Sequence, residues 1–292
     1  PRPSIPDPQA HRDRRDAGDR NDADLCRHGA LMSSTRRPPA GYYHGGLSGW
    51  GDDPTVGLVG AAGLHLHEDW MFASTGTAAK FGELGWTRTT IGSAPSVALG
   101  TPAAATEAGI IELTTGAQSN RGGTLNANGI AQLYQPAIGM VWAAKLDVDG
   151  TNNVEVWSGF SSSTNGRVRV SDSTEFIGVR YLATVGSWQG VCKNGSSATS
   201  ESTVTIGAHV AGTFQTLGFE AVDTDGAGTL GIQFYTFDAA DRHKLSRTAV
   251  GSPITTNIPL TTGALALGCV TTAASARVAR QDFWTLGGRI AR

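Results

Sequence analysis

The chain has 292 residues, of which 39% are hydrophobic and 16% charged, and its formal net charge is −2. Glycine is abundant at 39 residues, whereas Glu and Lys, which favour helices, number only 8 and 4, so a helical bundle or coiled coil is disfavoured. The balanced charge argues against a nucleic-acid-binding protein, and no apolar run is long enough to predict a membrane span. The composition therefore predicts a glycine-rich, β-rich protein.

Residues 1–40 differ from the rest of the chain in composition. They contain 8 Arg and 6 Asp but only 2 of the 39 glycines. The closely mixed charges between Arg12 and Arg27, with almost no large apolar residue, predict a disordered or extended tail. The interspersed Asp residues also disfavour an arginine arm that grips nucleic acid. The sequence begins with Pro1, and Met32 is the first possible start residue. We therefore expect residues 1–31 to be upstream sequence or a processed extension.

Residues 41–95 are rich in aromatic and histidine side chains but show no strong period. We expect this arm to cover an edge of the main sheet or to contact a neighbouring subunit. On a strand, His65 and His67 would share one face, where a carboxylate could complete a metal site. No third ligand has convincing spacing, so a segment that packs Trp70 and Phe72 inward is the favoured interpretation.

Residues 96–292 show the alternation of apolar and polar side chains that is typical of strands with one buried face. Asp, Asn and Gly separate these runs, as tight turns require. The pattern predicts an all-β fold, an antiparallel β-sandwich of jelly-roll type with ten to twelve strands and a mostly irregular N-terminal extension. The alternating runs are residues 138–148, 154–160, 176–182, 188–193, 203–210, 214–222, 230–237 and 277–290, with shorter candidates at 110–115 and 130–134.

Two Asp-x-Asp-Gly segments begin at Asp147 and at Asp223. Asp-Gly pairs favour tight hairpins, but the first segment also resembles the start of a calcium loop. The candidate oxygen ligands there are Asp147, Asp149, Asn152 and Glu155. The glutamate comes too early for the full twelve-residue loop, so a hairpin is the preferred prediction and no cofactor is expected.

No catalytic constellation stands out in the sequence. Sandwich-fold glycosidases often use a Glu-x-Asp-x-x-Glu strand, and the nearest grouping, Glu220 with Asp223 and Asp225, has the wrong spacing. No serine nucleophile elbow occurs. The three cysteines, Cys26, Cys192 and Cys269, lack metal-site spacing, and Cys192 and Cys269 could form a disulfide only if their strands adjoin. No catalytic residue is therefore predicted.

Exposed aromatic rings could stack on sugars. Trp157, Tyr181 and Trp188 are candidates, because each lies on a strand face whose burial the sequence does not assign. A tryptophan within a sandwich more often belongs to the core, which is the preferred interpretation.

Several stretches between Glu68 and Arg292 occur in an order that resembles a known family. They include an opening Glu-Asp-Trp-Met at 68–71, a Trp-bearing strand at 154–160, a Phe-rich pair at 218–222 and 232–238, and a closing Asp-aromatic strand at 282–289. Together they resemble the concanavalin-like lectin/glucanase jelly rolls of tailed-bacteriophage virion proteins. No catalytic motif of the glucanase branch carries over, because the matching carboxylates are absent.

This resemblance implies a non-enzymatic structural protein of the virion, such as a capsid decoration protein, head fibre or tail appendage. Its implied partners are other virion proteins and further copies of itself, with a cell-surface glycan as an additional candidate. The implied location is the virion, assembled in the host cytoplasm. Two alternatives remain: a carbohydrate-binding module of a surface or secreted protein and, less favoured, a glycoside hydrolase.

Overall fold

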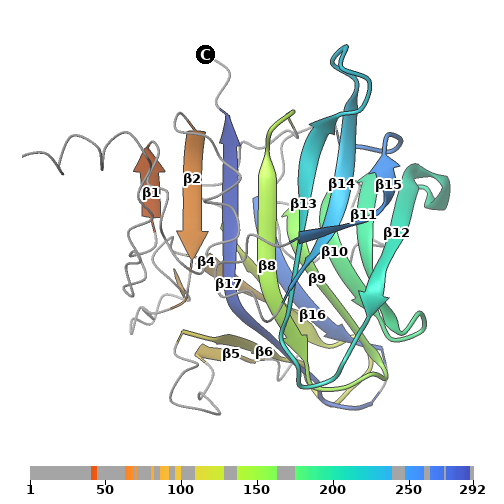
Figure 1. Cartoon of the computed structure of the whole chain (residues 1–292). Helices are drawn as coiled ribbons and strands as arrows, with labels where there is room; N and C mark the ends of the chain where they lie inside the picture. The colour runs from red at the N-terminus through yellow and green to blue at the C-terminus, as the bar shows by residue number, and fades with distance from the viewer. Residues whose placement is uncertain are drawn as a thin grey trace, which may run out of the picture.

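Two antiparallel sheets lie face to face in the computed structural model, as the alternating sequence pattern predicts (Figure 1). The structure describes residues 41–44, 63–68, 70, 80–81, 86–91, 96–99, 109–127, 137–162, 175–238, 247–259, 264–272 and 274–289. The predicted tail at 1–40 and the strand candidate at 130–134 lie outside these residues. None of the helical turns in the described residues has the length and apolar character needed to cross a membrane.

The front sheet has nine strands, and β17 joins its parts. On either side of β17 lie β2 and β8, while β6 pairs with another stretch of β17 and β5 pairs with β6. In spatial order the main path is β1 (Gly41–His44), β2 (Gly63–Glu68), β17 (Val278–Arg289), β8 (Val141–Val148), β13 (Gln215–Asp223), β14 (Leu230–Phe237) and β15 (Arg247–Ile254), with β5 (Ser96–Leu99) and β6 (Ile111–Thr114) beside it.

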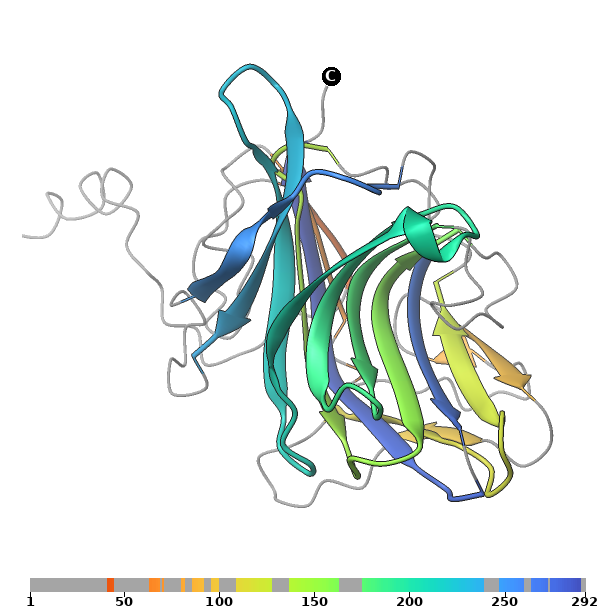
Figure 2. The same cartoon turned by 90° about the vertical axis from the view of Figure 1, so that its right-hand side faces the viewer.

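The back sheet has eight strands, several of which form one curved layer next to β13 and β14 (Figure 2). A short 3₁₀ turn, Ala198–Ser200, is capped by Ser197 and leads into its edge strand. The spatial order is β12 (Glu201–Ala208), β11 (Ser187–Asn194), β10 (Glu175–Leu182), β9 (Val154–Ser161), β16 (Ala264–Thr271), β7 (Gly122–Asn126), β4 (Trp86–Ile91) and β3 (Lys80–Phe81).

Aromatic rings from both sheets meet in the core between them. Trp142 on β8 stacks on Phe219 of β13 with centroids 5.4 Å apart, and Phe160 of β9 meets Phe219 edge-on at 6.3 Å. These offset and edge-on contacts are the favoured arrangements of aromatic pairs. The core side chains Trp142, Ala144 and Leu146 of β8 occupy every second position, which confirms the period-two prediction.

The two Asp-x-Asp-Gly segments have different structures. The segment at Asp223 closes a hairpin, because β13 pairs with β14, and residues 224–229 form its loop. The segment at Asp147 is not a hairpin: it follows β8 in the front sheet and leads to β9 in the back sheet. The hairpin prediction for this segment is wrong because the chain changes sheets there.

Strands from the predicted arm at 41–95 belong to the two sheets. β1 and β2 extend the front sheet beside β17, and β3 and β4 extend the back sheet beside β7. Trp70 is fully buried and its ring lies 5.1 Å from that of Trp86. The boundary expected near residue 95 therefore does not separate the sandwich from an outer segment.

The two cysteines in the described residues are free thiols in the core. Cys192 lies on β11 and Cys269 on β16, and β10 and β9 separate these strands. A disulfide between them is therefore excluded, because bridged residues must lie on adjoining backbone. Burial raises the pKa of both thiols well above the usual value. Cys26 lies outside the described residues.

Candidate functional site

The candidate site is the back sheet's outer face, which points away from the sandwich core. Neighbouring residues such as Val156 and Val179 face the core, so alternation directs Trp157 and Arg180 outward. Strand register places Gln189, Arg180, Trp157 and Gly268 in one row across β11, β10, β9 and β16. We call this surface the back outer face; its members include Glu155, Trp157, Phe176, Arg180, Gln189, Val191, Lys193, Glu201 and Val270.

The centre of the back outer face is a small apolar cluster around Trp157. Phe176, Val191 and Val270 pack with its indole, which is only 1% exposed. Gly268 lies directly beside this ring in the register, and a Cβ atom there would come within 2.1 Å of two ring carbons. The missing side chain of Gly268 therefore makes room for the indole.

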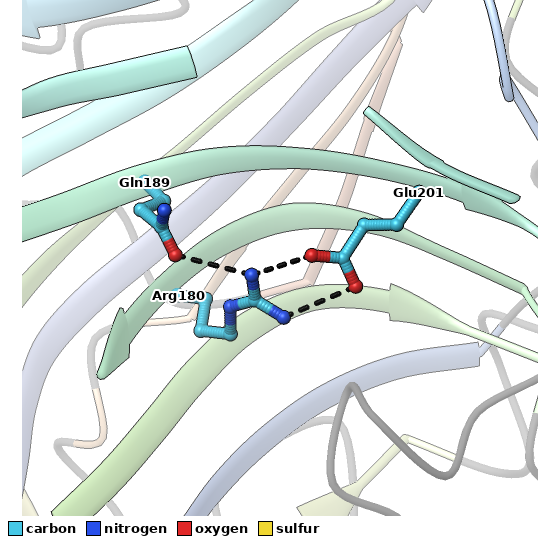
Figure 3. A network of polar contacts seen from close by, with 3 residues as sticks. All are labelled: Arg180, Gln189 and Glu201. Atoms are coloured by element: carbon cyan, nitrogen blue, oxygen red, sulfur yellow. Dashed lines mark hydrogen bonds and ion pairs between the residues drawn. The ribbon is translucent and has the colours of Figure 1, made fainter. Parts of the chain in front are cut away.

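Beside this cluster, Arg180 joins three strands through its guanidinium group (Figure 3). Its two terminal nitrogens donate to the two carboxylate oxygens of Glu201, at 2.6 and 3.2 Å. One of them also donates to Oε1 of Gln189 at 3.1 Å. Such two-point contacts between guanidinium and carboxylate are among the stronger hydrogen-bonded pairs. The network fixes β10, β11 and β12 relative to one another and holds planar polar groups at the edge of the sheet.

Glu155 and Glu201 are the carboxylates in the rows of the back outer face that cross β9 to β12. Their strands are three spacings apart, which separates the backbones by about 14 Å. Glycosidase carboxyl groups lie roughly 5 to 9.5 Å apart, and Glu201 is engaged by Arg180. The second residue after Glu155 is Trp157 rather than an acid. Glu201 is therefore held in an ion pair with Arg180, and the two carboxylates are not spaced like a glycosidase pair.

The three aromatic residues predicted to stack on a glycan are all buried. Trp157 lies on the outer face but within the apolar cluster. Tyr181 and Trp188 face the core, where Tyr181 donates to the carbonyl of Thr151 at 2.9 Å and Trp188 donates to Oε1 of Gln215 at 2.9 Å. The stacking prediction is wrong for all three, because no ring presents an open face; the core interpretation is confirmed for Tyr181 and Trp188.

The four predicted calcium ligands are not brought together. Asp147 is buried at the outer side of the front sheet, where Arg280 holds it at 3.1 Å, whereas Glu155 lies on the back outer face. Asp149 and Asn152 are exposed in the connection between the sheets. The calcium prediction is wrong because the chain crosses between sheets inside the proposed loop. No cluster of three or more metal-ligating side chains occurs in the described residues.

The other metal candidates, His65 and His67, lie on β2 opposite Gly287 and Thr285. Their side chains are outside the described part of the structure. Of the acidic group at Glu220, Asp223 and Asp225, Glu220 pairs with Arg247 at 2.9 Å, and both aspartates accept hydrogen bonds from their own turn. That group is therefore a set of structural contacts.

Sequence reasoning missed Arg180, Gln189 and Glu201, which come from three different strands. The alternation of β10 does place Arg180 on the same side as Phe176, which is a usable local signal. Pairing the three side chains also requires the register of β11 and β12, which no short motif specifies.

Comparison with known proteins identifies solved structures with a similar fold. No family model and no curated protein matches the chain. A protein of unknown function from Shewanella oneidensis MR-1 aligns with a TM-score of 0.51 and 12% identity, over 79% of this chain and 89% of that one. The fold is an antiparallel β-sandwich of jelly-roll type.

Two further structures are similar over most of their length. A lichenase from a mouse hindgut metagenome has a TM-score of 0.46 and 13% identity, over 77% of this chain and 99% of that one. A carbohydrate esterase from the Shiga toxin-encoding bacteriophage phi24B has a TM-score of 0.42 and 17% identity, over 72% and 94%. These likenesses concern the fold and assign no activity.

Proposed function

We propose that this chain is a non-enzymatic structural protein of a tailed-bacteriophage particle, serving as a capsid decoration protein, head fibre or tail appendage. The proposal rests on one observation: on the outer face of each sheet, charged side chains form ion pairs that join different strands. Arg180 and Glu201 join strands of the back sheet, and Arg280 joins Glu112 and Asp147 across three strands of the front sheet. Carboxylates held in this way reinforce a sheet, and Glu201, Glu112 and Asp147 are each engaged by an arginine.

The test is the protein content of purified particles. Mass spectrometry of density-gradient-purified phage from a lysogen or lysate carrying this gene is expected to find the chain at a fixed ratio to the major capsid protein. Its recovery in the soluble fraction alone, with none in the particles, would contradict the proposal.

A second measurement addresses catalysis directly. Release of reducing ends from soluble β-glucans is expected to equal the background, and to be the same for wild type, Glu155→Gln and Glu201→Gln. Hydrolysis by the wild type that both variants abolish would favour a glycoside hydrolase instead.

A carbohydrate-binding module is the second candidate, and one observation favours it. Next to the Arg180 network, Thr203 and Thr205 of β12 are exposed on the same face as Gln189. Hydroxyl, amide and guanidinium groups at one sheet edge are suited to hydrogen bonding with sugar hydroxyls. Glycan-array binding that Thr205→Val removes and that the front-sheet variant Arg280→Lys keeps would support this candidate. Absence of binding by the wild type would count against it.

A further inference from the structure

A histidine ring is enclosed by two aromatic rings at the end of the sandwich where β8 crosses to β9. The centroid of His209 lies 4.4 Å from that of Tyr181 and 5.9 Å from that of Trp188. Tyr181 and Trp188 are themselves 5.6 Å apart. We call these three residues the histidine cluster. His209 directly follows β12, and it is 8% exposed although it lies at the start of a connecting loop.

The loop that begins at His209, residues 209–214, is tied to the sandwich by a few hydrogen bonds. Gly212 donates its amide to the carbonyl of Val148, 3.1 Å away. Gln215 accepts from Trp188 and from the amide of Val210, and it donates to the carbonyl of Ala208. Val210 is 53% exposed despite being apolar. Apart from the buried ring of His209, the loop is therefore held mainly by polar contacts.

Within the described residues, neither ring nitrogen of His209 makes a hydrogen bond of good geometry. Burial lowers the pKa of His209 from its ordinary value; the nearby Asp147 carboxylate and, more weakly, polar contacts with Gln215 and with the backbone of Gly150 and Val148 act in the opposite direction. Asp147 is already paired with Arg280, which weakens its pull on a proton. Burial among the rings of Tyr181 and Trp188 favours the neutral imidazole, because the polar contacts of His209 only partly offset the cost of burying a charge.

The other groups that face His209 do not compensate a positive charge. On β10 it meets Tyr181, whose pKa burial raises, so this phenol is neutral. On β11 and β13 it meets Trp188 and Gln215, which do not titrate. Asp149, in the connection from β8 to β9, is exposed to solvent. A proton added to His209 therefore enters a site in which Asp147 is the nearest charge of opposite sign.

We infer that protonation of His209 releases the loop at 209–214 from the end of the sandwich. At neutral pH the uncharged ring fills the space beside Tyr181 and Trp188. In acid the charged ring moves to water, the hydrogen bonds from Gly212 and Val210 are lost, and the rings of Tyr181 and Trp188 become accessible. Acid therefore exposes an apolar surface at one end of the fold. This inference does not depend on the proposed role in a phage particle.

The direct test is hydrogen exchange of the full chain between pH 7.5 and 5, corrected for the intrinsic pH dependence of amide exchange. Amides in residues 209–214 are expected to lose protection by about tenfold for each pH unit below the onset of protonation. The amides of β13 and β14 are expected to stay protected. Unchanged protection of residues 209–214 in the wild type would overturn the inference.

Variants and tryptophan fluorescence provide a second, independent test of the loop release. His209→Gln keeps a neutral polar side chain, so its loop is expected to show no acid-dependent loss of protection. Acrylamide quenching of tryptophan fluorescence should rise in acid for the wild type and not for Trp188→Phe. A rise of equal size in Trp188→Phe or in His209→Gln would contradict the loop release.

Discussion

The outer faces of the two sheets differ in how they use charge. On the front sheet, charged side chains join strands: Lys145 meets Asp282, and Arg280 meets Glu112 and Asp147. Arg247 of β15 reaches across β14 to Glu220 of β13 and covers the ring of Tyr235 at 4.1 Å. On the back sheet, the centre is apolar around Trp157 and the charges gather toward β12. The charged groups of the front face are therefore engaged in contacts within the protein. The back face has a buried apolar centre and carries its polar groups near the edge strand β12.

The back face should be most sensitive to added volume. Gly268→Ala is expected to lower the free energy of unfolding by about 3 kcal/mol, because the new methyl group collides with the indole of Trp157. Urea denaturation followed by circular dichroism measures the loss. The control Gly207→Ala places its methyl in open space on β12 and should change stability by less than about 0.5 kcal/mol. Equal losses for the two variants would break the distinction.

The front face should instead be most sensitive to loss of charge. Asp147→Asn is expected to destabilise the protein by about 2 kcal/mol, since it removes the carboxylate that holds Arg280 at a buried position. The same denaturation experiment applies. Asp149→Asn, two residues away and exposed, is the matched control and should shift stability by less than about 0.5 kcal/mol. A larger loss for the control would show that the turn and not the ion pair matters.

The free energy of unfolding is expected to depend on pH because of His209. Its folded pKa is lowered below the ordinary value of 6.5, so the unfolded chain binds the proton more tightly. The stability that neutral His209 provides is therefore complete above pH 6.5 and declines as the pH falls below it. The free energy of unfolding of His209→Gln should vary less between pH 7.5 and 5.5 than that of the wild type. Parallel pH profiles would contradict this assignment.

The smallest effect is expected in the exposed loop between β13 and β14. Asp225 accepts hydrogen bonds from the side chain of Thr229 and from the amides of Ala227 and Thr229, and these contacts hold its pKa well below the usual range. Their stabilisation is present above about pH 4 and is lost as the pH falls further. Asp225→Asn should lower the melting temperature slightly at pH 7, and its difference from the wild type should shrink near pH 2.5. A constant difference would show that ionisation of Asp225 is irrelevant.

The sequence predicts the fold best where apolar and polar residues alternate along a strand. β8 and β14 lie within predicted alternating runs, and β10, β11 and β13 match such runs to within one residue at each end. β7 and β16 have small or apolar residues at most positions, so their sequences show no such alternation. In β15, Gly251 and Pro253 lie at an irregularity in the pairing with β14, so its pattern is broken.

The candidate site was less predictable than the fold, for a physical reason. Trp157 and Trp188 have the same residue type and similar local patterns, yet one faces outward and the other faces the core. Whether Asp147 and Glu155 approach each other depends on the sheet to which each strand belongs. Such information resides in long-range pairing, and single-sequence periodicity carries only short-range information.

The position of β17 has a consequence for how the protein is made. This strand is the last of the fold along the chain, yet it pairs with β2, β6 and β8 and so connects three otherwise separate groups of strands. During synthesis the earlier strands leave the ribosome before residues 278–289. Until those residues emerge, the edges that pair with β17 are unpaired. Pairing between such distant segments is slow, and waiting edges invite pairing with other chains. Completion of the front sheet is therefore a late event that follows the emergence of residues 278–289.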